Sequence, residues 1–143
     1  MDIKDTKDYL NQIRFLDRVI NHMLEEIYEL RVSATSIGAV QNKEKVQTSP
    51  GNDKIGAIVS KIVDMEKRTD EIVDRRADML DDVRKTIIRI ESDKQRKILW
   101  MKYIDGKSIS QIAEELGVET RWCKRLHNKA LEEFGKIHKN HNI

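Results

Sequence analysis

The sequence is poor in the residues on which several protein classes depend. Its 143 residues include one Cys, one Pro, six Gly, two Trp, three Tyr and two Phe. A single cysteine cannot form an internal disulfide, and so little Gly and Pro excludes a collagen or a mucin-like stalk. The fold must therefore rest on side-chain packing. With 36% charged residues and few aromatics, the composition is typical of a soluble, helix-rich chain with thin cores.

Long hydrophobic runs are also missing. Apolar residues occur singly or in short runs, whereas a helix that spans a bilayer needs about 20 in succession. The first residues, MDIKDTKDY, are too polar for a secretory signal peptide. We therefore expect a cytoplasmic protein with no membrane partner.

Charge is distributed unevenly along the chain. Residues 1–92 carry 16 basic and 18 acidic side chains, whereas residues 93–143 carry 11 basic and 7 acidic ones. A basic C-terminal third on an otherwise balanced chain indicates a polyanionic partner.

Residues 1–92 carry two series of apolar residues at alternating spacings of three and four, which predict two long amphipathic helices. The first series is Tyr9, Ile13, Leu16, Ile20, Met23, Ile27 and Leu30. The second begins after Asp53, a candidate N-cap, and continues to about residue 91 through Ile55, Ile58, Ile62, Met65, Thr69, Ile72, Arg76, Met79, Val83, Thr86 and Ile90.

Most of residues 33–54 is rich in small polar residues and holds the only proline, so we expect a loop between the two helices. The prediction for residues 1–92 is a long antiparallel, coiled-coil-like hairpin. The first helix can cover only part of the long second stripe, so we expect a partner chain to cover the rest, most simply in a homodimer.

Residues 93–143 predict a helix-turn-helix domain. The helix at about 94–104 ends at Asp105-Gly106; Ser108 with Gln111 forms a capping box for a short helix, and Gly117 is suited to the left-handed turn that ends it. A longer helix follows from about residue 120. The seven key positions of the motif are filled as two crossing helices require, by Ile112, Ala113, Leu116, Gly117, Val118, Cys123 and Leu126.

The longer helix has a polar, basic face opposite its buried face, and this face suits the major groove of double-stranded DNA. For base edges we expect Arg121, Lys124 and Arg125, with Asn128 on the same face. For the phosphate backbone we expect Thr120, Lys129, Ser108 and Gln111. Trp122 has two interpretations, either along the sugar-phosphate edge or packed against the helix at 94–104. An ordinary solvated helix remains the structural alternative for the whole face.

These residues carry a family resemblance. Residues 94–134 resemble region four of the sigma-70 class of transcription factors, in the blocks QIAEELGV and KRLHNKALEEF. The whole chain is similar to small phage regulators of the ArpU and RinA kind, in its helical N-terminal part, the run EKVQTSP, the long helix and the region-four-like end. The resemblance implies promoter binding in a bacterial host, contact with the host RNA polymerase and activation of late genes.

Two departures limit the resemblance. Glu119 stands where the family usually has a Ser or Thr N-cap, although its charge suits a helix N-terminus. The chain also has nothing like the aromatic-rich sigma region that melts promoters, so we do not expect a complete sigma factor.

Motifs for catalysis and metal binding are missing: the sequence has no Gly-rich phosphate loop, paired-Cys spacing or nucleophile elbow. His22 and His127 are scattered, His138 and His141 fall in a tail that we expect to fray, and Cys123 is a core position of the motif. We therefore expect no enzyme activity, no cofactor and no metal.

The leading hypothesis is a phage or prophage DNA-binding transcription regulator. One alternative is a small terminase subunit that recognises phage DNA for packaging, which ring assembly would favour. Another is a protein-only RNA polymerase adaptor, which an absence of salt-dependent DNA affinity would favour.

Overall fold

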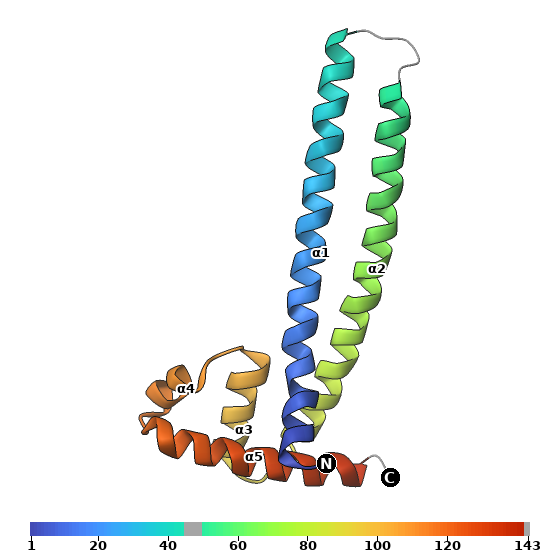
Figure 1. Ribbon diagram of the computed structural model, residues 1–143. Coiled ribbons are helices and arrows are strands. Elements are labelled where there is room, and N and C mark those ends of the chain that lie inside the picture. Colours follow the sequence, from blue (N-terminus) through green and yellow to red (C-terminus); the bar gives the residue numbers. More distant parts are fainter. Residues whose placement is uncertain (45–49, 142–143) are drawn as a thin grey trace. The chain divides into compact units, whose positions relative to one another are not determined.

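The computed structural model describes residues 1–44 and 50–141, and the regular structure within them is helical (Figure 1). The elements are α1 (Ile3–Glu44), α2 (Pro50–Ile87), α3 (Asp93–Leu99), a π-helical turn η1 (Trp100–Ile104), α4 (Ile109–Leu116) and α5 (Thr120–His141). This confirms the predicted all-α class, with a long helical hairpin followed by a C-terminal helix-turn-helix. Among the described residues, no helix combines the length and the apolar character needed to span a bilayer.

The loop expected at residues 33–54 is wrong over its described part, because α1 continues to Glu44 and α2 already begins at Pro50. The Thr35 hydroxyl donates to the Arg31 carbonyl at 2.9 Å, so this polar stretch is accommodated inside the helix. Proline suits a helix start, where its missing N–H has no partner to lose. Asp53 consequently lies in the first turn of α2 and is not its N-cap. Residues 45–49 lie outside the described residues.

The chain divides into two compact units. Unit 2 is residues 17–75, the part of the hairpin nearest its connection, in which α1 and α2 run antiparallel side by side (Figure 1). Its buried cluster is small, consisting of Ile27, Ile62 and Met65, with Leu30 and Ile58 packed against them. An ion pair between Arg31 and Glu66 also joins the two helices. These buried residues belong to the two predicted apolar series.

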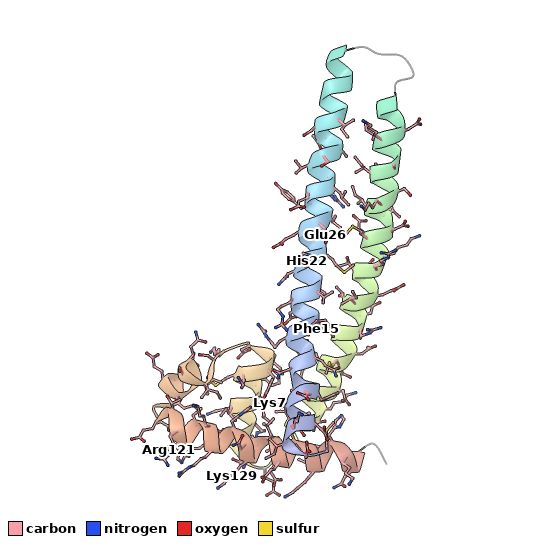
Figure 2. The ribbon with its side chains drawn as sticks, viewed as in Figure 1. Lys7, Phe15, His22, Glu26, Arg121 and Lys129 are labelled. Atoms are coloured by element: carbon pink, nitrogen blue, oxygen red, sulfur yellow. The ribbon has the colours of Figure 1, made fainter. Side chains whose placement is uncertain are left out.

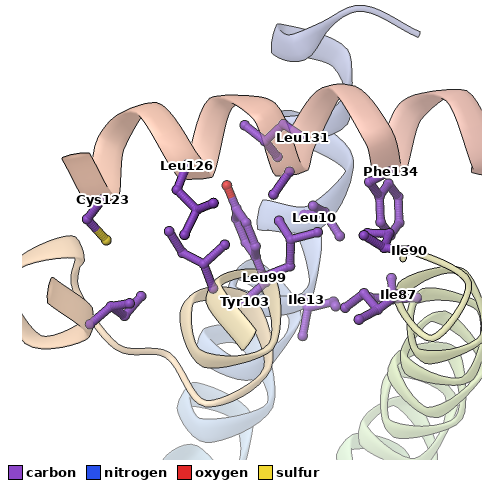
Figure 3. Close-up of a cluster of buried hydrophobic side chains, with 14 of the residues drawn as sticks. Leu10, Ile13, Ile87, Ile90, Leu99, Tyr103, Cys123, Leu126, Leu131 and Phe134 are labelled. Atoms are coloured by element: carbon purple, nitrogen blue, oxygen red, sulfur yellow. The ribbon is translucent and has the colours of Figure 1, made fainter. Parts of the chain in front are cut away.

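Unit 1 combines residues 1–16 with residues 76–143, so its division from unit 2 does not coincide with the expected boundary at 92/93. The reason is a shared core, shown in Figure 3. Leu10 and Ile13 of α1 and Val83 of α2 are buried in the same cluster as residues of α3, η1, α4 and α5. The helix-turn-helix is therefore built onto the open end of the hairpin.

The end of α2 is also set by this core. The helix stops at Ile87, before the predicted end near residue 91, and the Ile90 N–H donates to the Ile87 carbonyl at 3.0 Å in the turn that follows. Ile90 is thereby buried at 2% exposure, although it is no longer part of α2. Ser92 then caps α3, because its side chain accepts from the Gln95 N–H at 3.3 Å.

A polar cluster joins three helices within unit 1. The Asp82 carboxylate of α2 accepts from the Tyr9 hydroxyl of α1 at 2.5 Å and lies 2.9 Å from His138 Nε2 of α5. His138 is buried and stacks on Phe134 at 5.6 Å between ring centroids. The expectation that His138 lies in a frayed tail is therefore wrong. The side chain of His141 lies outside the described part of the chain.

Candidate nucleic-acid interface

The first helix of the motif, α4, is held at both ends as predicted. The Ser108 hydroxyl accepts from the Gln111 N–H at 3.2 Å, and Gln111 Oε1 accepts from the Ser108 N–H at 2.9 Å, which completes the capping box. Both side chains are exposed. Because both oxygens accept within the cap, the Ser108 O–H and the amide NH₂ of Gln111 are the groups left to donate to a phosphate.

The turn between α4 and α5 depends on Gly117. Its φ of 68° and ψ of 34° lie in the left-handed region, which a residue with a Cβ rarely adopts. The following N–H, of Val118, donates to the Ala113 carbonyl at 3.0 Å. Ala113 is 3% exposed, as expected for a small residue where two helices cross. The sequence thus fixes both ends of α4 by local hydrogen bonds.

The second helix, α5, begins where the motif requires. The Glu119 carbonyl accepts from the Cys123 N–H at 3.0 Å, so Glu119 occupies the N-cap position. Cys123 and Leu126 point into the core (Figure 3), and Ala130 is buried with them. Burial also raises the pKa of the Cys123 thiol, which keeps it protonated and unreactive.

The residues expected to bind DNA all lie on exposed surface. On α5 these are Thr120, Arg121, Trp122, Lys124, Arg125, Asn128 and Lys129, and on or beside α4 they are Ser108 and Gln111. Figure 2 labels Arg121 and Lys129 near the two ends of this face. We call the α5 members the α5 basic face.

The cations of the α5 basic face are available to a ligand. In the part of the chain that the structure describes, no ion pair with Asp or Glu engages Arg121, Lys124, Arg125 or Lys129. By contrast Lys107, which precedes α4, is paired with Glu115 at 2.8 Å. Unpaired cations on one helix face attract a polyanion without first breaking an internal ion pair.

Trp122 contacts the helix at 94–104, and its place along the sugar-phosphate edge stays a prediction. Its side chain lies 5.2 Å, from ring centroid to Nζ, from Lys94 of α3, yet it remains 39% exposed. Together with Arg125, Leu126 and Lys129 it lines a shallow hollow of about 180 Å³. Sequence reasoning missed Lys94. The only available signal was its place in the first turn of the helix expected to meet Trp122.

Behind the α5 basic face, a buried hydrogen bond ties α5 to η1. The Tyr103 hydroxyl lies 2.7 Å from His127 Nε2. Burial, followed by the positive charges of Lys102 and Lys7, lowers the pKa of His127 to about 4. Burial raises the pKa of Tyr103. At neutral pH a protonated tyrosine is therefore hydrogen-bonded to an uncharged imidazole, and His127 serves as part of the scaffold.

The described residues contain no group of three or more His, Cys, Asp or Glu side chains placed to hold a metal ion. His22, which sequence analysis considered only as a scattered histidine, is exposed and lies 3.1 Å from Glu26 on the same helix.

Comparison with known proteins finds a similarity that falls on this site. The family model described as sigma-70, region 4 matches residues 92–133, which is α3 through most of α5. No curated protein and no solved structure matches the chain. The helix-turn-helix is thus similar to region 4 of sigma-70, a similarity that indicates DNA binding and a role in transcription regulation.

Proposed function

We propose that this chain is a sequence-specific transcription regulator that binds double-stranded DNA by placing α5 in the major groove. The observation that carries the proposal is the α5 basic face, whose four cations are exposed and engaged in no ion pair among the described residues. The capped α4 and the Gly117 turn support the proposal, because they fix both ends of the helix that precedes α5.

The proposed contacts divide by chemistry. Arg121, Lys124 and Arg125 read base edges, since Arg and Lys donate to both acceptors of a guanine. Asn128 suits an adenine edge. Four residues fix the register through phosphates: Ser108, Gln111, Thr120 and Lys129.

We further propose a homodimer formed through the N-terminal helices, acting without catalysis, cofactor or metal in the cytoplasm of a bacterial host. The resemblance to phage regulators of the ArpU and RinA kind supports a phage or prophage origin, activation of late genes and contact with RNA polymerase. A dimer would place two recognition helices about 34 Å apart, or a multiple of that, on a repeated site.

The test is selection of bound sequences from a random double-stranded DNA pool. The parent protein is compared with a variant in which Arg121, Lys124 and Arg125 are changed to Glu. A matched control carries the same change of charge on exposed positions of α2, at Lys54, Lys61 and Arg68. We expect the parent and the control to enrich the same motif and the α5 variant to enrich none.

Salt dependence separates the possible outcomes. If the interface neutralises about six phosphates, affinity should fall about a thousandfold between roughly 50 and 200 mM salt. If the parent enriches no sequence and shows no salt-dependent DNA affinity while remaining folded, the proposal is wrong and a protein-only adaptor takes its place. Motif symmetry, read from the same data, reports whether one or two helices engage the site.

A further inference from the structure

Among its described side chains, unit 2 exposes more large apolar residues than it buries. Its described buried cluster has three members, whereas six large hydrophobic residues are exposed: Leu24, Tyr28, Val32, Val59, Val63 and Val73. Tyr28 is 68% exposed and Leu24 is 51% exposed. Single exposed apolar residues are ordinary, but this number over one short hairpin marks an interaction surface when the residues are contiguous.

The spacing makes most of them contiguous. On α1, Leu24, Tyr28 and Val32 recur every four residues, so they form one stripe along that helix. On α2, Val59 and Val63 share the same spacing. Each helix therefore carries, besides the seam that meets its neighbour, a second apolar stripe about a quarter turn away.

Both stripes lie on the same side of the hairpin. In an antiparallel pair of helices, each helix presents its seam residues to the other. A rotation of the same sense about each helix axis, starting from that seam, leads to the same outer face of the pair. The Arg31–Glu66 ion pair marks that face, since each partner lies three residues after a stripe member, Tyr28 on α1 and Val63 on α2. We call the set Leu24, Tyr28, Val32, Val59 and Val63 the hairpin apolar face.

The other side of the hairpin is different in character. A hollow there is lined by residues of both helices and is mostly polar: Glu26, Glu29, Leu30, Ser33, Lys61 and Met65. The hairpin apolar face is thus one-sided, as a surface that pairs with a single partner should be.

We infer that the hairpin apolar face binds a second copy of this chain, face to face, with the two hairpins parallel. The inference rests on the homodimer proposed above and adds its surface and its orientation. A two-fold interface requires a self-complementary patch. Two stripes of similar size, one on each helix, meet that requirement, because each can pack on the other stripe of the second copy.

Charge beside the stripes selects the orientation. Glu25 and Glu29 line a hollow along α1 together with Leu24 and Tyr28, whereas Lys67 lies one turn after Val63 on α2. The contacts of Ile27 with Ile62 and Met65 put Glu25 and Lys67 at similar heights on the hairpin.

When the two-fold axis runs along the helices, the two hairpins are parallel and α1 of one copy faces α2 of the other. Glu25 and Glu29 of each copy then lie near Lys67 of the second copy. When the hairpins are antiparallel, α1 faces α1 and the carboxylates of the two copies approach each other, which is unfavourable. The parallel arrangement also brings residue 75 of both copies, which continues into the DNA-binding unit, to the same end of the four-helix bundle.

The surface is tested by measuring the oligomeric state in sedimentation equilibrium. The disrupting variant carries Tyr28→Glu and Val63→Glu. The matched control carries Ser33→Glu and Ala57→Glu, which are exposed positions beside the polar hollow. We expect the parent and the control to be dimers and the disrupting variant to raise the dissociation constant about a hundredfold or more, because unpaired charges would be buried in an apolar interface. A monomeric parent, or a disrupting variant that dimerises like the parent, overturns the inference.

The orientation is tested by disulfide formation between single-cysteine substitutions, which does not require the dimer to be broken. Cys123 is fully buried, so the introduced thiols are the accessible ones. In a mixture of Glu25→Cys and Lys67→Cys chains we expect the mixed disulfide to dominate under mild oxidation. If Glu25→Cys chains link chiefly to one another, the hairpins are antiparallel and the stated orientation is wrong.

These outcomes are independent of DNA binding. A monomeric parent that still enriches a DNA motif would remove this inference and leave the DNA-binding proposal in place. A dimer with the expected disulfide pattern but without DNA enrichment would support this inference and remove the DNA-binding proposal.

Discussion

Acid should weaken unit 1 through one buried histidine, His127. In the folded chain its pKa is lowered to about 4, first by burial and then by the charges of Lys102 and Lys7. In the unfolded chain an imidazole titrates near its ordinary value of about 6.5. Between these two values the unfolded state binds more protons than the folded state, so stability is lost as pH falls from about 6.5 toward about 4.

The size of the effect follows from the two pKa values. Linkage between about 6.5 and about 4 predicts a loss of about 2 kcal/mol on going from about pH 7 to about pH 5. The assay is urea unfolding followed by tryptophan fluorescence. Both tryptophans of the chain, Trp100 and Trp122, belong to unit 1, so the signal reports the unit that contains His127.

Comparison with variants isolates the histidine from the other groups that titrate in this range. His127→Gln removes the titration and keeps a hydrogen-bonding group for the Tyr103 hydroxyl, so most of the pH dependence should disappear. His22→Gln, at an exposed position of unit 2, should leave it unchanged. If the parent and His127→Gln lose the same stability between the two pH values, the reasoning about His127 is refuted.

Four further outcomes follow from the same structure. Leu10→Ala, which empties a fully buried site, should destabilise unit 1 by about 3 kcal/mol in the fluorescence assay, and a change below about 1 kcal/mol would contradict the shared core. Gly135→Val should also destabilise by about 2 kcal/mol, because a Cβ there would lie 2.9 Å from the Thr6 hydroxyl, and an unchanged midpoint would count against that close approach. Lys129→Ala should reduce the salt slope of DNA binding by about 0.9 without changing the selected motif, whereas a changed motif would make it a base-reading residue. A fragment of residues 93–143 should unfold at a lower urea concentration than the full chain, and equal midpoints would show that the hairpin end gives no support.

Local signals in the sequence were sufficient to predict the motif and its exposed face. Ser108 and Gln111 form a capping box from residues three apart, and Gly117 adopts the left-handed conformation that its lack of a Cβ permits. The α5 basic face follows from helical periodicity, since its members are set by residue spacing alone. The assignment of bases and phosphates to these residues stays a prediction.

The features that could not be predicted from the sequence are of two kinds. Some depend on contacts between residues far apart in the chain, and others on a small difference in preference between turn and helix. The loop prediction failed because residues 33–44 contain polar residues that favour turns only slightly over helix, and no proline falls among them. The polar cluster of Tyr9, Asp82 and His138 joins residues far apart in the chain, and no periodicity in the sequence indicates such a contact. Lys94 escaped notice for the same reason, because its role depends on where Trp122 comes to lie.

The shared core changes how the region-four-like segment should be understood. A recognition helix must be held within a fraction of an ångström to discriminate bases, so its support matters as much as its charged face. Here that support includes Leu10 and Ile13 of α1, outside the matched residues 92–133. The Tyr103–His127 hydrogen bond and the contact of His138 with Asp82 fix α5 at two further points along its length. The hairpin end is therefore part of the DNA-binding unit, and any surface that joins two hairpins is connected through continuous helices to the elements that position α5.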